Sequence, residues 1–150
     1  MNSVAKTATG ELTDSFDFLI RDTRLLVMSQ IENRLSRLNI PIRIWFPLRV
    51  IYRNEGLTQR ELGRHIGYGD ARAGVIVDVM VRRKLVSRRQ SNRDKRRIDL
   101  YLTPAGRKMA QQVMRQASAV NKQIVAGFTL SEVETLRALL LRVHENLKTS

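Results

Sequence analysis

The sequence has no cysteine, only three prolines and few aromatic residues. Without cysteine there is no disulfide framework, cysteine zinc site, thiol nucleophile or cysteine redox switch. No apolar run approaches the length of a membrane span, and the polar first residues lack the hydrophobic segment of a signal peptide. We therefore expect a soluble, cytoplasmic protein that has no contact with a membrane and a core of mainly aliphatic side chains.

Basic residues are abundant and unevenly placed. The 27 Lys and Arg residues outnumber the 14 Asp and Glu residues, for a formal net charge of +13. Between residues 57 and 109 there are fourteen basic and five acidic residues, and residues 82–97 hold nine basic residues and one acidic residue. Such crowding raises the repulsion within the free protein and attracts polyanions. Charge alone is compatible with DNA, RNA, an anionic membrane surface or an acidic protein as the partner. Together with the helix pair that precedes the basic stretch, it favours a nucleic-acid surface over an ordinary solvated face.

The first part of the chain is predicted to be helical. Apolar residues spaced by three and four predict a helix that starts after Asp14 as its N-cap. A second helix is expected from Pro41 to about Gly56. Pro47 conflicts with it because an interior proline removes a backbone hydrogen bond, so this helix either starts near Trp45 or is kinked.

Two short helices follow in close succession. Thr58 and Glu61 have the spacing of a capping box, which predicts a helix ending near Gly67. The next helix, which we call the recognition helix, is expected over residues 69–84. Its β-branched run at residues 75–81 taken alone favours a strand, but Ile76, Met80 and Arg83 stand at helical spacing and favour a helix. Two helices joined by a short glycine-containing turn are typical of a helix-turn-helix.

The remaining chain is predicted to contain a hairpin and two helices. Residues 85–90 and 98–102 alternate apolar and polar side chains and predict a β-hairpin. A helix is expected from Thr103 to about Gly127, and a last helix is opened by a capping box of Ser131 and Glu134. The expected fold is mainly α with a small β-wing, a winged helix-turn-helix flanked by dimerisation helices. Its expected parts are a flexible segment 1–13, a dimerisation region 14–40 and 103–150, and a DNA-binding domain 41–102.

Two motifs carry a resemblance to a known family. The motifs are Leu-Thr-Gln-Arg-Glu-Leu-Gly at residues 57–63 and Asp-Lys-Arg-Arg-Ile-Asp-Leu-Tyr-Leu-Thr-Pro-Ala-Gly at residues 94–106. The sequence resembles the MarR family of winged-helix bacterial regulators from about Asp14 to Leu147. The resemblance implies a homodimer with interleaved terminal helices, bound to a pseudo-palindromic operator in double-stranded DNA. It further implies a repressor that a small, often aromatic or phenolic acid releases from DNA.

The resemblance also implies roles for particular residues. Asp94 would orient the wing arginines, and Arg96 would reach the minor groove. The recognition helix lacks the Ser/Thr-rich start common in the family, which leaves Asp70 and Arg72 to read base edges, although Arg72 fits a phosphate contact equally well. The small residues Ala71, Ala73 or Val75 would contact thymine methyl groups. The complete predicted DNA-binding set is Thr58, Gln59, Asp70, Arg72, Ala73, Val75, Arg88, Arg93, Asp94, Lys95, Arg96 and Arg97.

The predicted effector site rests on three residues. Arg43, Trp45 and Arg49 could bind an aromatic carboxylate, with the ring stacked on the indole and the carboxylate paired to a guanidinium. The alternative is that Trp45 belongs to the core and both arginines are solvated. His65 and His144 have no partner at metal-ligand spacing, so neither a metal nor another cofactor is expected. No nucleophile–base pair or carboxylate dyad is present, and we do not expect an enzyme.

Two other functions fit the same composition. A nonspecific architectural DNA-binding protein is favoured by the weakly polar recognition helix and predicts steep salt dependence with little sequence preference. A basic RNA-binding module is also compatible with the net charge. The scarcity of aromatic residues argues against single-stranded targets, because such targets are held largely by stacking.

Overall fold

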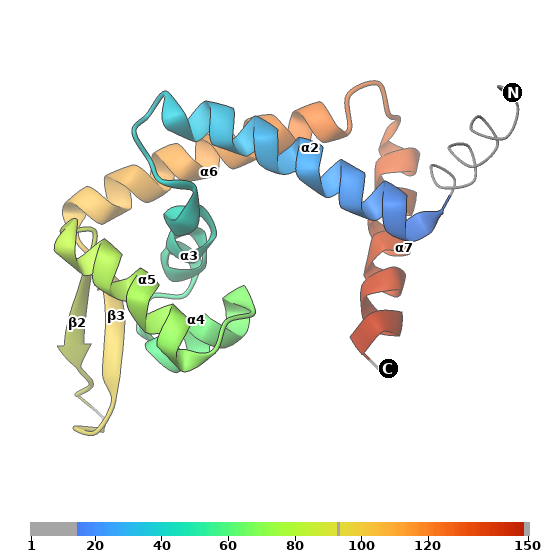
Figure 1. The fold of residues 1–150 in the computed structure, drawn as a ribbon. Coiled ribbons are helices and arrows are strands. Elements are labelled where there is room, and N and C mark those ends of the chain that lie inside the picture. Colours follow the sequence, from blue (N-terminus) through green and yellow to red (C-terminus); the bar gives the residue numbers. More distant parts are fainter. Residues whose placement is uncertain (1–14, 93, 149–150) are drawn as a thin grey trace, which may run out of the picture.

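The computed structural model describes residues 15–92 and 94–148 and confirms the predicted mainly α, winged-helix fold (Figure 1). Two long helices, α2 and α6, pack along one another above the smaller helices α3, α4 and α5, and α7 turns away at the end opposite the hairpin (Figure 1). The helices are α2 (Phe16–Ser36), α3 (Ile42–Arg53), α4 (Gln59–Ile66), α5 (Asp70–Arg82), α6 (Pro104–Ile124) and α7 (Leu130–Lys148).

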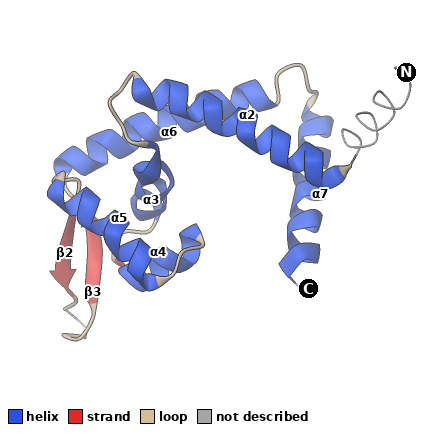
Figure 2. Cartoon of the chain, viewed as in Figure 1, coloured by secondary structure: helices blue, strands red, loops and turns tan. Residues whose placement is uncertain are grey.

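A three-stranded antiparallel sheet forms the wing (Figure 2). Strands β2 (Val86–Gln90) and β3 (Ile98–Leu102) pair along their whole length, with Val86 opposite Leu102 and Gln90 opposite Ile98. The predicted hairpin is therefore confirmed. The short strand β1 (Leu57–Thr58) pairs with the other edge of β3. It was not predicted, because two residues are too few to show an alternating pattern.

The core is aliphatic, as expected, and lies around α3, between the two long helices and the winged-helix elements. Trp45 is the one tryptophan and is 4% exposed. Burial of a large aliphatic side chain stabilises a fold by roughly 1.5–3 kcal/mol. Side chains with almost no exposed surface include Leu35, Ile44, Leu48, Ile51, Leu62, Val77, Met80, Leu100 and Val113.

Helix α3 begins at Ile42, with Pro41 as its N-cap, and contains Pro47. The alternative that this helix begins near Trp45 is wrong. The predicted end at Gly56 was also too late, because the helix ends at Arg53. Pro47 takes away only the hydrogen bond to the Arg43 carbonyl, and its ring is buried in the core.

Helix α5 confirms the helical prediction against its β-branched composition. Ala73, Ile76, Val77 and Met80 are buried at helical spacing, so tertiary packing outweighs the local preference for a strand.

The capping box predicted at Ser131 and Glu134 is wrong. The box forms two residues earlier, where the Thr129 hydroxyl accepts a hydrogen bond from the Glu132 amide at 3.3 Å and the Thr129 amide donates to the Glu132 carboxylate at 2.7 Å.

The ends of two other helices also refine the predictions. Helix α6 ends at Ile124, slightly before the predicted Gly127, and the predicted N-cap Asp14 lies outside the described residues. Helix α7 has no buried residue within this single chain. Most of its apolar side chains, together with Phe16, Leu19 and Ile20 at the start of α2, are exposed. No helix in the described part of the chain is long and apolar enough to span a membrane.

Candidate nucleic-acid interface

The turn between α4 and α5 is built by local interactions. The Thr58 hydroxyl accepts a hydrogen bond from the Glu61 amide at 3.2 Å, and the Glu61 carboxylate accepts one from the Thr58 amide at 2.7 Å, so the predicted capping box is confirmed. Gly67 ends α4 in the left-handed conformation, with φ of 70°. The amide of Tyr68 then donates to the Gly63 carbonyl at 2.9 Å. These contacts fix where α5 begins.

The start of α5 presents a short exposed face. Asp70 is exposed and lies 3.6 Å from the Arg60 guanidinium. Arg72 is exposed, and its guanidinium carbon lies 3.9 Å from the centre of the Tyr68 ring, in cation–π geometry. Val75 is 64% exposed and is available for contact. Ala73 has no exposed surface, so the prediction that it contacts thymine is wrong.

Gln59 and Arg88 connect three elements beside this face. The Gln59 amide donates to the Asp70 carbonyl at 3.3 Å, and Arg88 donates to the Gln59 side-chain carbonyl at 3.2 Å. Arg88 also pairs with Asp78 at 2.7 Å. The network therefore joins α4, α5 and β2. Gln59 and Arg88, two residues predicted to bind DNA, therefore already have hydrogen-bond partners within the chain.

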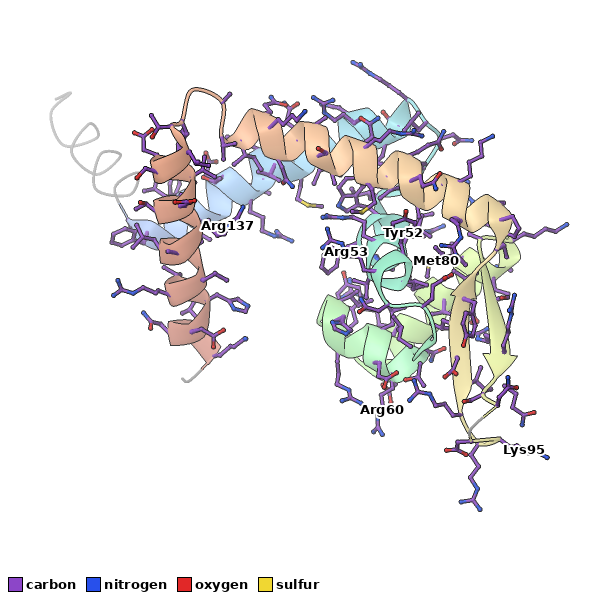
Figure 3. The ribbon with its side chains drawn as sticks, turned by 180° about the vertical axis from the view of Figure 1, so that it is seen from behind. Tyr52, Arg53, Arg60, Met80, Lys95 and Arg137 are labelled. Carbon is purple, nitrogen blue, oxygen red and sulfur yellow. The ribbon has the colours of Figure 1, made fainter. Side chains whose placement is uncertain are left out.

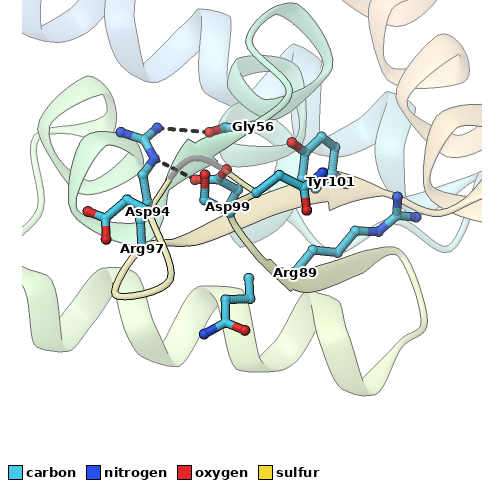
Figure 4. A pocket seen from close by; sticks show the side chains of 9 residues that line it. Gly56, Arg89, Asp94, Arg97, Asp99 and Tyr101 are labelled. Carbon is cyan, nitrogen blue, oxygen red and sulfur yellow. Dashed lines mark hydrogen bonds and ion pairs between the residues drawn. The ribbon is translucent and has the colours of Figure 1, made fainter.

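Arg97 turns back from the wing toward the body of the protein (Figure 4). It donates to the Asp99 carboxylate at 2.6 Å, to the Gly56 carbonyl at 3.0 Å and to the Glu61 carboxylate at 3.1 Å. Asp99 is only 7% exposed. The hydrogen bond with Asp99 raises the pKa of Arg97. Hydrogen bonds from Thr58, joined by the charge of Arg97, hold the pKa of Glu61 below its usual value. Arg97 thus anchors the wing to the first turn of α4.

The outer tip of the hairpin is exposed and basic. The Asp94 carboxylate accepts a hydrogen bond from the Arg96 amide at 2.9 Å, and the Asp94 carbonyl accepts one from the Arg97 amide at 2.9 Å. Asp94 therefore shapes the backbone that carries Arg96, whereas the carboxylates that hold Arg97 are Asp99 and Glu61. Lys95 and Arg96 are exposed, and Figure 3 shows Lys95 projecting from the tip on the same side of the molecule as Arg60. Arg93 lies outside the described residues.

A hollow of about 740 Å³ lies beside the inner side of the hairpin (Figure 4). Arg97 crosses it between Gly56 and Asp99, and the Arg89 guanidinium lies 5.1 Å from the centre of the Tyr101 ring. Arg97 and Asp99 are thus paired, Arg89 packs on Tyr101, and the Asp94 carboxylate accepts from the Arg96 amide, so the hollow belongs to the support of the wing.

A separate apolar pocket of about 380 Å³ lies where α2, α3 and the turn before α5 meet. It is lined by Met28, Ile42, Arg43, Trp45, Phe46, Pro47, Ile66 and Tyr68. The structure thus brings together two of the three predicted effector residues. Trp45 is also part of the core, as the alternative reading expected.

Arg49, the third predicted effector residue, is not in the lining of the apolar pocket. Its guanidinium carbon lies 5.2 Å from the centre of the Trp45 ring. Its Nε is buried and has no hydrogen-bond partner among the described residues. Burial, with a smaller contribution from the charge of Arg53, lowers the pKa of Arg49. Arg49 therefore packs on the indole beside the pocket.

Four residues that take part in these contacts were not predicted to do so: Arg60, Tyr68, Asp78 and Asp99. Glu61 was predicted as a capping residue, and its ion pair with Arg97 was not. For Asp99 a signal was present, because Asp99 follows Arg97 by two residues at the start of β3, and side chains at this spacing in an extended chain share one face. For Tyr68 there was none, because its neighbours come from three separate elements.

Comparison with known proteins shows which family and which solved structures this chain resembles. Residues 45–97 match the sequence model of the MarR family. An uncharacterized HTH-type transcriptional regulator of Bacillus subtilis, YybA, is 26% identical over 98 residues, which is 65% of this chain and 65% of that protein. A crystal structure of a probable transcriptional regulator from Pseudomonas aeruginosa is 29% identical, with a TM-score of 0.74 over 88% of this chain and 98% of the other.

The same fold occurs in CouR of Rhodococcus jostii. A structure of the repressor CouR bound to a 23-mer DNA duplex has a TM-score of 0.79 at 19% identity, covering 90% of this chain and 96% of the other. A structure bound to p-coumaroyl-CoA has a TM-score of 0.75 at 21% identity, covering 88% and 93%. The helix-turn-helix and the basic wing are those of the winged-helix transcriptional regulators that the chain resembles. The resemblance to the MarR family is confirmed by the match of residues 45–97 to that family's model.

Proposed function

We propose that the protein is a homodimeric, sequence-specific DNA-binding repressor that a small aromatic acid releases from its operator. The observation that carries the DNA-binding part is the placement of Lys95 and Arg96 at the exposed hairpin tip, while Arg97 anchors the hairpin to α4. A basic tip on a fixed support suits insertion into a groove, and its neighbours would contact phosphates. The DNA-bound form of CouR, which has the same fold, supports this arrangement.

Dimerisation is supported by the uncovered apolar side chains. Phe16, Leu19 and Leu26 on α2 are exposed, as are Leu139, Leu140 and Leu141 on α7. A soluble monomer rarely leaves so large an apolar surface open to water. A second copy would cover it and set the two recognition helices roughly 34 Å apart, the spacing of two successive major grooves.

Binding of the protein to the DNA upstream of its own gene tests the function. We expect a fluorescently labelled duplex of that region to bind at least about tenfold more tightly than a scrambled duplex of the same composition. Sedimentation should show two chains bound per duplex. Equal affinities would contradict sequence-specific binding and favour the architectural alternative, which the pairing of Arg88 and the burial of Ala73 also favour. Competition by duplex RNA at equal concentration would favour the RNA-binding alternative.

The proposed effector site is the apolar pocket. Its wall of aromatic and aliphatic side chains suits a flat ring, and Arg43 is the one cationic residue in its lining. The structure of CouR with p-coumaroyl-CoA supports an aromatic ligand class. Arg49 would act indirectly by holding the Trp45 ring.

Trp45 is the only tryptophan and lines the apolar pocket, so its fluorescence should report occupancy. We expect 4-hydroxycinnamate to change the emission saturably and to weaken DNA binding. Arg43→Ala should weaken ligand binding about three- to tenfold, because a partly hydrated charge-assisted hydrogen bond is lost. Arg37→Ala removes an exposed arginine outside this pocket and should have no effect. An equal loss in both variants would contradict the assignment of Arg43.

A further inference from the structure

The ring of Tyr68 belongs to two sites at once. Tyr68 is one of the residues that line the apolar pocket, together with Trp45 and Phe46, and its side chain packs against the core. It also supports Arg72, whose guanidinium carbon lies 3.9 Å from the ring centre. Arg72 stands in the first turn of α5, on the exposed face predicted to meet DNA. One side chain therefore connects the lining of the pocket with the recognition helix.

The backbone of Tyr68 is held firmly in the turn. Its amide donates to the Gly63 carbonyl at 2.9 Å, and Gly67 before it is in the left-handed conformation. A Cβ at Gly63 would lie 2.8 Å from the Tyr68 carbonyl oxygen, so α4 and the turn are already in close contact. The backbone is thus restrained on the side of α4, and the part of Tyr68 that can respond to a ligand is the ring.

We propose that Tyr68 is a positioning residue that couples the pocket to DNA recognition through Arg72. This inference rests on the proposed DNA-binding function and adds the means of its regulation. With the pocket empty, the ring holds the Arg72 guanidinium toward the DNA. An occupant that rotates the ring removes this support, so the more flexible Arg72 loses its DNA contact. By linkage, bound DNA disfavours the same occupant to the same degree.

A double-mutant cycle measured on the preferred duplex tests the positioning role without any ligand. Tyr68→Leu should weaken DNA binding about two- to tenfold, the range expected for loss of a cation–π support. Arg72→Ala should weaken it at least as much. The double variant should bind like Arg72→Ala alone, since the ring acts only through that arginine. Tyr68→Phe retains the ring and should restore the affinity lost in the leucine variant.

Additive losses from Tyr68→Leu and Arg72→Ala would overturn the proposal. So would a phenylalanine variant as weak as the leucine variant, because the hydroxyl rather than the ring would then matter. Circular dichroism and thermal unfolding of every variant separate a local effect from loss of the fold. If Tyr68→Leu unfolds, the cycle is measured with Tyr68→Phe and Tyr68→Trp instead. Each of these variants is made alone and together with Arg72→Ala. The comparison still decides whether the aromatic face acts through Arg72.

A second measurement concerns regulation. Saturating 4-hydroxycinnamate, with occupancy followed by Trp45 fluorescence, should weaken DNA binding of the wild type but leave that of Tyr68→Leu nearly unchanged. An equal loss of DNA affinity in both proteins would overturn the coupling. Failure of the proposed function gives different results, because the wild type would then not prefer its duplex or would show no fluorescence change. In the latter case the mutant cycle alone decides the role of Tyr68.

Discussion

Replacement of Gly106 by alanine is expected to destabilise the fold by roughly 3 kcal/mol or more, at the upper end for overpacking. A Cβ at this position would lie 1.8 Å from the Leu85 carbonyl oxygen, which is far inside van der Waals contact. That oxygen also accepts a hydrogen bond from the Thr103 amide at 3.0 Å. Neither α6 nor the start of the wing can move away without losing this bond. Urea unfolding followed by circular dichroism would measure the change.

Gly74 offers a matched control, because the same substitution there meets only a flexible side chain. Its new Cβ would lie 3.0 Å from the Gln59 amide nitrogen, which can shift. Alanine inside a helix is favoured over glycine by about 1 kcal/mol, so Gly74→Ala should be neutral or stabilising. Similar losses in the two variants would show that close packing against Leu85 is not the reason for Gly106.

Arg96→Ala is expected to weaken binding to the preferred duplex about tenfold to a hundredfold, in keeping with roughly 1–3 kcal/mol for a specific arginine contact. Arg96 is exposed at the hairpin tip, where its amide is fixed by Asp94 at 2.9 Å. The backbone that carries the Arg96 side chain is therefore fixed, and the side chain itself makes no contribution to the core. Fluorescence anisotropy across a salt series would measure both the affinity and its salt dependence.

Arg115→Ala is the control for net charge, because it removes an exposed arginine from α6. It should leave the affinity almost unchanged. Both variants should sediment like the wild type. Equal losses in the two would mean that Arg96 contributes only to the general field of the protein, and unchanged affinity in Arg96→Ala would remove it from the interface.

Much of the fold could be predicted because it is encoded locally. The capping box of Thr58 and Glu61 and the alternation in β2 and β3 depend on residues close together in the chain. The helical prediction for α5 also depended on the stripe of Ile76 and Met80. Ala73 precedes Ile76 by three positions and belongs to the same buried stripe, so its burial could have been predicted from that spacing.

The functional surface was harder to predict, because distance along the chain does not show which charges pair. Arg96 and Arg97 are adjacent and chemically identical, yet one is exposed at the tip and the other joins Glu61 and Asp99. That difference depends on the approach of α4, which brings Glu61 to Arg97, and on the position of Asp99 in β3. The apolar pocket likewise requires α2, α3 and the turn at Tyr68 to meet, and no local pattern contains this information.

The ion pairs within the chain affect the rate at which a DNA-binding protein of this kind finds its target site. Arg88 and Arg97 each have a carboxylate partner within the chain, at 2.7 Å and 3.1 Å. A guanidinium that is already neutralised releases fewer counterions from an arbitrary duplex, so it adds little to sequence-independent attraction. Each encounter with unrelated DNA is then shorter, and more sites are sampled in a given time. The carboxylates beside these arginines thus lower the affinity for non-specific DNA and favour a faster search for the target site.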